Sequence, residues 1–136
     1  MDAVEMRRRV SNATVARLAT IGRDGRPHIV PITFAFGDDE LYFAVDHKPK
    51  RTFNLQRLRN IEANPAVSVL VDHYENDWSK LWWVRVDGQA RIVNAGERRD
   101  QAIALLRARY EHYRSLPPGG PVVAVAVEKL SGWSAT

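Results

Sequence analysis

Three cations, Lys48, Lys50 and Arg51, fall within four residues where an apolar run ends and a segment with helical spacing begins. The apolar run is 41–45, and the helix that follows could take Thr52 as its N-cap. Free N–H groups and the positive end of a helix favour an anion, and nearby cationic side chains add to that preference. The cluster therefore predicts a phosphate-binding site, although a solvated surface loop explains the same residues equally well.

A second candidate is the segment 77–85, DWSKLWWVR, which holds three tryptophans within six residues. In an alternating strand, Trp82 and Trp83 point to opposite faces. One ring can fill the core, and the other must cover a partner subunit or a flat aromatic ligand. Lys80 and Arg85 stand beside these rings and could hold further anionic groups.

Other familiar catalytic arrangements are missing from the sequence. The absence of cysteine excludes disulfides, thiolate metal sites and cysteine nucleophiles. The four histidines show no metal-ligand spacing, the glycines form no Walker or dinucleotide-type loop, and no serine stands in a nucleophile elbow. The basic cluster and the tryptophan-rich segment are left as the two candidate sites.

Length and composition indicate one ordinary globular domain. A chain of 136 residues predicts a single domain, 1–136, around one core, and 45% hydrophobic with 26% charged residues is typical of soluble proteins. A net charge of +4 favours an anionic partner, either nucleic acid or a phosphorylated cofactor. No secretory h-region and no membrane-length apolar run is present, so we expect a cytoplasmic protein with no membrane partner.

The elements that would position these residues are mostly strands joined by hairpin turns. Strand patterns cover residues 14–21, 28–36, 41–45, 66–72, 81–93 (bent at 87–88) and 122–133, and helical spacing covers 3–11, 52–63 and 97–113. Pro31 cannot donate to a ladder, so its strand should lie at an edge or a bulge. The order favours a mainly β fold, a six-stranded antiparallel barrel with helices covering its openings.

Three stretches resemble the split-barrel flavin and deazaflavin-dependent oxidoreductases, the pyridoxamine-5'-phosphate-oxidase-like proteins. They are ARLATIGRDGRPHIVPITFAF (16–36), LYFAVDHKPKR (41–51) and NPAVSVLVDHYENDWSKLWWVRVDGQARI (64–92). The likeness runs roughly from residue 9 to residue 133. The KPK and DWSKLWWVR motifs are narrower and are similar to an actinobacterial subgroup described as coenzyme F420-dependent enzymes.

The resemblance implies an FMN-binding type of split β-barrel with six strands. It also implies a homodimer with two cofactor sites at the subunit interface. Lys50 matches the lysine that holds the cofactor phosphate, and Trp78 matches an aromatic position near the ring in the partner subunit. At the phosphate end of the cofactor, the resemblance implies contacts from Val45, Asp46, Lys48 and Arg51. Beside the tricyclic ring it implies the strand Val30, Pro31, Ile32 and Thr33. Weaker matches are Lys80 and Arg85.

These observations predict an oxidoreductase that transfers a hydride from reduced F420 to an unsaturated, conjugated small molecule. Residues 41–47 hold no arginine, so the Arg-x-x-x-x-Lys phosphate motif of true pyridoxamine phosphate oxidases is absent and FMN is the weaker choice. An FMN-dependent enzyme and a non-catalytic cofactor carrier are the alternatives. A nucleic-acid-binding barrel has only scattered arginines in its favour, without an aromatic-interleaved motif, so we expect no nucleic-acid partner. No side chain stands out as a proton donor.

Overall fold

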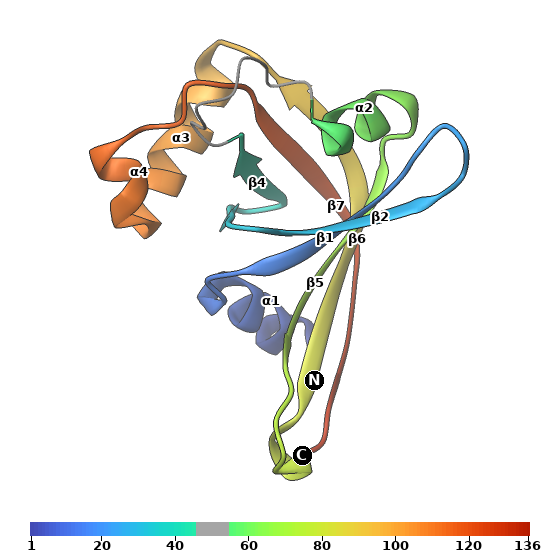
Figure 1. The fold of residues 1–136 in the computed structure, drawn as a ribbon. Coiled ribbons are helices and arrows are strands. Elements are labelled where there is room, and N and C mark those ends of the chain that lie inside the picture. Colours follow the sequence, from blue (N-terminus) through green and yellow to red (C-terminus); the bar gives the residue numbers. More distant parts are fainter. Residues whose placement is uncertain (46–54) are drawn as a thin grey trace.

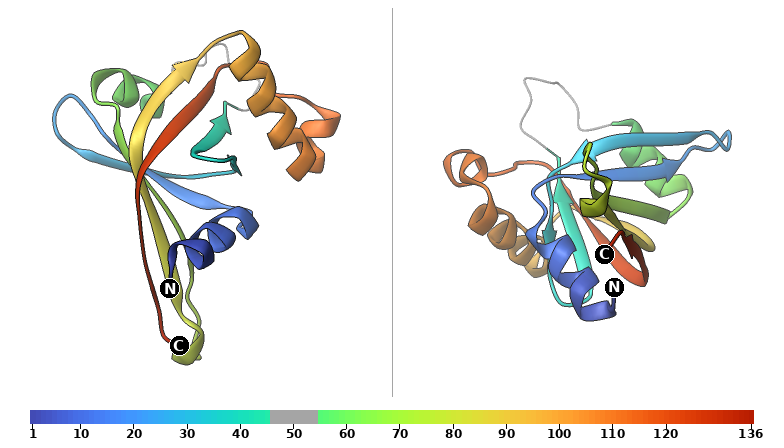
Figure 2. Two further views of the ribbon diagram at one scale, coloured as in Figure 1. Left: turned by 180° about the vertical axis from the view of Figure 1, so that it is seen from behind. Right: turned by 90° about the horizontal axis from the view of Figure 1, so that it is seen from below.

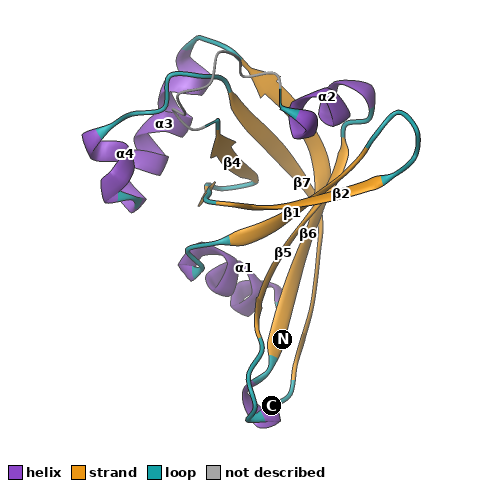
Figure 3. Ribbon diagram, in the orientation of Figure 1, coloured by secondary structure: helices purple, strands orange, loops and turns teal. Residues whose placement is uncertain are grey.

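The protein is a curled antiparallel sheet with helices around its rim (Figures 1 and 3). The structure, a computed structural model, describes residues 1–45 and 55–136. Their seven strands are β1 (Ala16–Ile21), β2 (Pro27–Ile32), β3 (Ala35–Phe36), β4 (Glu40–Ala44), β5 (Ala66–His73), β6 (Trp82–Val93) and β7 (Val122–Ser134), in the order β2-β1-β5-β6-β7-β4-β3. The helices are α1 (Ala3–Asn12), α2 (Gln56–Ala63), the 3-10 helix η1 (Trp78–Lys80), α3 (Glu97–Arg109) and α4 (Glu111–Ser115).

The inner face of the sheet carries the core, because successive side chains of a strand point to opposite faces. In β5, Val67, Val69 and Val71 are buried, whereas the residues between them are not. Val10 of α1 and Leu58 of α2 pack into the same apolar cluster. The predicted mainly β architecture with flanking helices is therefore confirmed.

The strand predicted over 28–36 is broken in two, which raises the strand count from six to seven. Strand β2 ends at Ile32, and the chain crosses through Thr33 and Phe34 to β3 on the other edge of the sheet. The backbone N–H and C=O of Phe34 bond to the Tyr110 hydroxyl and not to a neighbouring strand. The helix predicted over 97–113 also divides, at Tyr110, into α3 and α4.

Strand β6 runs unbroken through the predicted bend, where the pairing with β7 shifts register between Asp87 and Gly88. A side chain on Gly88 would place its Cβ 2.2 Å from the carbonyl oxygen of Ala126, so only glycine fits. Beyond this bulge the ends of β5, β6 and β7 project from the sheet with η1 at their tip (Figures 1 and 2). We call this projection, residues 71–86 and 130–134, the arm.

No helix within residues 1–45 or 55–136 is both long enough and apolar enough to cross a bilayer.

Candidate cofactor site

The strand predicted to run beside a cofactor ring is the edge strand β2. One side of β2 pairs with β1, and no described strand pairs with its other side. Such an edge presents a row of unpaired N–H and C=O groups, to which Pro31 contributes only its carbonyl. Val30 and Ile32 face the core side, and Pro31 faces outward as expected for an edge position. This backbone edge can offer hydrogen bonds to the rim of a flat heterocycle.

Val45 lies at the end of β4, where the predicted phosphate-binding segment begins. It is 3% exposed, and its N–H donates to the carbonyl of Pro121 at 3.2 Å. Val45 and Ile32 belong to the same core cluster. Four predicted site residues lie outside the described part of the chain: Asp46, Lys48, Lys50 and Arg51. The phosphate site therefore stays a prediction.

Trp78 and Lys80 lie in η1 at the tip of the arm. Trp78 is 76% exposed, and Lys80 lies 4.0 Å from the carboxylate of Asp77. Figures 1 and 2 both place this tip well away from β2 of the same chain. The chain therefore does not bring Trp78 to its own ring strand.

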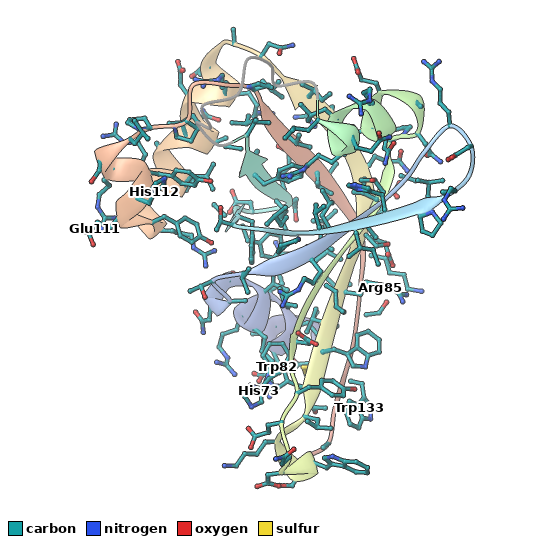
Figure 4. The ribbon with its side chains drawn as sticks, viewed as in Figure 1. His73, Trp82, Arg85, Glu111, His112 and Trp133 are labelled. Atoms are coloured by element: carbon teal, nitrogen blue, oxygen red, sulfur yellow. The ribbon has the colours of Figure 1, made fainter. Side chains whose placement is uncertain are left out.

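Trp82 and Trp83 lie on opposite faces of the arm, as the alternation predicts. Trp82 packs against the core with the Arg9 guanidinium 4.8 Å from its ring centre. Trp83 lies on the outer face, 5.9 Å from the guanidinium of Arg85, which also bonds Asp87 at 3.2 Å. Figure 4 shows Arg85 on one side of the arm and Trp82 on the other.

The outer face of the sheet contains an apolar hollow of about 650 Å³, lined by residues of β1, β2, β5 and β6. Its walls include Ile29, Leu70, Tyr74 and Trp83, with Arg17 at the rim. Sequence reasoning did not single out Ile29 or Leu70, although strand alternation places both on this face. Large exposed apolar patches are uncommon on a monomer, so this face is suited to contact with a partner or a ligand.

Thr33, the last residue of the predicted ring strand, is held from the C-terminal half of the chain. Its hydroxyl lies 3.0 Å from the hydroxyl of Tyr113 in α4. The next residue, Phe34, is bonded through its backbone to Tyr110. The sequence carried no local signal for these contacts, because the partners lie about 80 residues apart.

Perturbed ionisation is found at Glu40, on the opposite sheet edge from β2. Burial works against ionisation of Glu40, but hydrogen bonds from Arg91 and Tyr42 and the charges of Arg91 and Arg98 outweigh it, so the pKa of Glu40 lies below its ordinary value. Burial, followed by the hydrogen bond to Glu40, raises the pKa of Tyr42. These contacts tie β4 to β6 and α3 and have a structural role.

The whole described architecture matches a family model. The model described as pyridoxamine 5'-phosphate oxidase matches residues 3–134. The chain belongs to the pyridoxamine 5'-phosphate oxidase family. The resemblance read from the sequence is confirmed at the level of the family, and the match does not extend to a subgroup.

Several solved structures share this fold. A conserved hypothetical protein from Mycobacterium tuberculosis is 22% identical, with a TM-score of 0.81 over 99% of this chain and 86% of that one. A FAD-binding protein from Mesorhizobium loti is 26% identical, with a TM-score of 0.72 over 97% of this chain and 94% of the other. The heme storage protein HutZ from Vibrio cholerae is 20% identical, with a TM-score of 0.74 over 97% and 93%. No curated protein sequence matches significantly.

Proposed function

We propose that this family member is a homodimeric oxidoreductase that uses reduced coenzyme F420 to reduce an unsaturated, conjugated small molecule. The observation that supports the proposal most directly is the unpaired edge of β2, in a chain of this family. The deazaflavin, when bound, supplies the hydride. The protein supplies binding, orientation and a water-poor apolar surface.

The residues divide the binding between two ends of the cofactor. The backbone of Val30–Thr33 lies along the ring, with the apolar side chains of β2 beside it. Lys50 holds the phosphate, and Lys48, Arg51 and Lys80 add modest attraction for the anionic tail. Exposed ion pairs are each worth about 0 to 1 kcal/mol, so the tail should add affinity through several weak contacts.

The arm supports the dimeric part of the proposal. Tyr74, Trp78 and Trp133 are exposed on it, and truncating aromatic residues at the centre of a protein interface costs affinity more than truncating most other residues. In a dimer, Trp78 of one protomer would complete the ring site of its partner. A single chain holds these two parts of the site at separate places.

Two alternatives use the same β2 edge. One is an FMN-dependent enzyme, and it draws support from the fold shared with the FAD-binding protein of Mesorhizobium loti. The other is a non-catalytic carrier, supported by the fold shared with the Vibrio cholerae heme storage protein. The missing arginine in 41–47 argues against a conventional FMN phosphate site.

The test is a titration of the purified apoprotein with F420, FMN and heme in parallel. We expect F420 to bind most tightly, and added salt to weaken F420 more than FMN because its tail carries more charge. Tighter binding of FMN at every salt concentration would replace the deazaflavin with the flavin. Preferential binding of heme would favour the carrier.

The residue-level test is Lys50→Ala, with Lys129→Ala on the exposed part of β7 as the matched control. Losing a charged hydrogen bond to phosphate should cost about 1.5 to 3 kcal/mol of F420 binding energy, whereas the control should bind normally. An unchanged dissociation constant for Lys50→Ala would restore the solvated-loop interpretation of the basic cluster.

A further inference from the structure

Two tyrosines and an arginine at the junction of α3 and α4 hold the chain where β2 ends. We call Arg109, Tyr110 and Tyr113 the clasp. The Tyr110 hydroxyl accepts a hydrogen bond from the N–H of Phe34 at 3.1 Å, and it lies 3.0 Å from the carbonyl oxygen of the same residue. One side chain thereby satisfies both backbone groups of Phe34, which would otherwise be unpaired where the ladder stops.

The clasp has further contacts on both sides of this point. Tyr113, 4% exposed, places its hydroxyl 3.0 Å from that of Thr33. The Tyr110 hydroxyl also lies 2.9 Å from the carbonyl oxygen of Thr14, in the segment that leads into β1, so its single proton is shared between this carbonyl and that of Phe34. The Arg109 guanidinium lies 5.0 Å from the ring centre of Phe34. The entry to β1 and the exit from β2 are therefore fixed to the same helix junction.

This anchoring matters because β2 is an edge strand. An edge strand has ladder bonds on one side only, and strand ends with few buried bonds are the first to open. Tyr110, between α3 and α4, and Tyr113 of α4 supply hydrogen bonds at Phe34 and Thr33, where a strand in the middle of a sheet would bond to a second neighbouring strand. The position of Val30–Thr33 then depends on contacts made about 80 residues later in the chain.

We infer that Tyr110 and Tyr113 are positioning residues, which set the conformation of the β2 edge that receives the cofactor ring. This inference rests on the proposed function for the identity of the ligand. The clasp acts through Thr33 and Phe34 and needs no contact with the cofactor. Loosening the clasp should therefore weaken binding of the cofactor ring.

The experiment combines Tyr113→Phe and Thr33→Val, singly and together, with Thr33→Ser as the conservative variant and Ser115→Ala, at the exposed end of α4, as the control. Each single variant should weaken F420 binding about three- to tenfold, the usual effect of one lost hydrogen bond. The effect of the double variant should be smaller than the sum of the two single effects, because both single variants remove the contact between the two hydroxyls. Thr33→Ser keeps the hydroxyl and should recover most of the affinity lost in Thr33→Val, and Ser115→Ala should bind as the wild type does.

Hydrogen exchange of the apoprotein gives a second readout that needs no cofactor. Tyr113→Phe should speed exchange of the amides in 29–36 severalfold and leave the β5–β6 pairing unchanged. Tyr110→Phe should speed this exchange more than Tyr113→Phe does. If Tyr110→Phe does not fold, the test uses Tyr113→Phe alone. Unchanged exchange in 29–36 would overturn the inference, as would faster exchange with unchanged F420 affinity. If the wild type binds no cofactor, both the proposed function and the positioning role are overturned. Faster exchange in Tyr113→Phe would in that case still show that the clasp anchors the end of β2.

Discussion

Two regions of the molecule place an arginine beside an aromatic ring but differ in how far the ring is buried. One is the corner, Thr33 and Phe34, where the chain passes from β2 to β3, and the other is the arm. At the corner, Phe34 is fully buried and lies beneath the guanidinium of Arg109. On the outer face of the arm, Trp83 lies beside Arg85. Trp133, the cross-strand partner of Trp83, is exposed, and so is Trp78 in η1. Both regions pair an arginine with an aromatic ring, yet only the corner encloses its ring within the chain.

The difference indicates which parts of the site one chain completes. The corner satisfies its backbone groups through Tyr110, so the ring strand is held without help from another molecule. The arm carries aromatic surface that a single chain leaves uncovered. Changes at the corner should therefore affect folding, and changes on the arm should affect association.

The largest expected effect is on the corner. Phe34→Ala should lower the free energy of unfolding by about 3 to 5 kcal/mol, because it removes a buried aromatic side chain and leaves a cavity. Trp133→Ala on the partly exposed arm should cost clearly less in the same urea titration. Equal losses in the two variants would contradict the contrast between the regions.

A smaller effect is expected from Trp78→Ala, and it should fall on association. Removing an interface aromatic should weaken the dimer by about 2 kcal/mol, whereas removing an exposed side chain should change the stability of the monomer by no more than about 0.5 kcal/mol. Sedimentation over a concentration series measures the dimer. Val4→Ala is the control, because Val4 is 77% exposed but lies on α1. A wild type that remains monomeric, or a Trp78→Ala dimer of normal strength, would exclude the arm as the interface.

The smallest effect is a dependence on acid at Glu40, in the strand that pairs with β3. The pKa of Glu40 in the folded protein lies below its ordinary value of 4.5, so its ionised form stabilises the fold above that pH. This contribution should disappear as the pH falls through the folded pKa. Urea unfolding of the wild type and Glu40→Gln should therefore differ at neutral pH and converge in acid. A difference that grows in acid would reverse the sign of the proposed effect.

Much of the fold could be predicted from local pattern. Alternation in 66–72 and the hairpin turns are short-range features, and they were sufficient for the antiparallel, mainly β architecture. Pro31 predicted an edge strand because a missing N–H is a property of one residue. The opposite faces of Trp82 and Trp83 followed from the period of a strand.

The breaks at Thr33–Phe34 and at Tyr110 could not be predicted in the same way. The 28–36 segment reads as one strand, and 97–113 reads as one helix, because local propensity favours continuation in each case. The two interruptions meet in space, where the Tyr110 hydroxyl takes over the backbone bonds of Phe34. Each break is explained by the other element, so neither segment alone could reveal it.

The sequence by itself determined the strand periods, the turns, the tryptophan-rich segment and the family resemblance, because each depends on residue types at short spacing. Only the tertiary structure decided that the chain leaves β2 for the opposite edge of the sheet, that Tyr110 and Tyr113 fix the end of β2, and that Trp78 lies away from the ring strand of its own chain. Those three facts depend on contacts or distances between residues that are distant in the sequence. Such contacts are selected by the packing of the whole chain and not by the properties of any one segment.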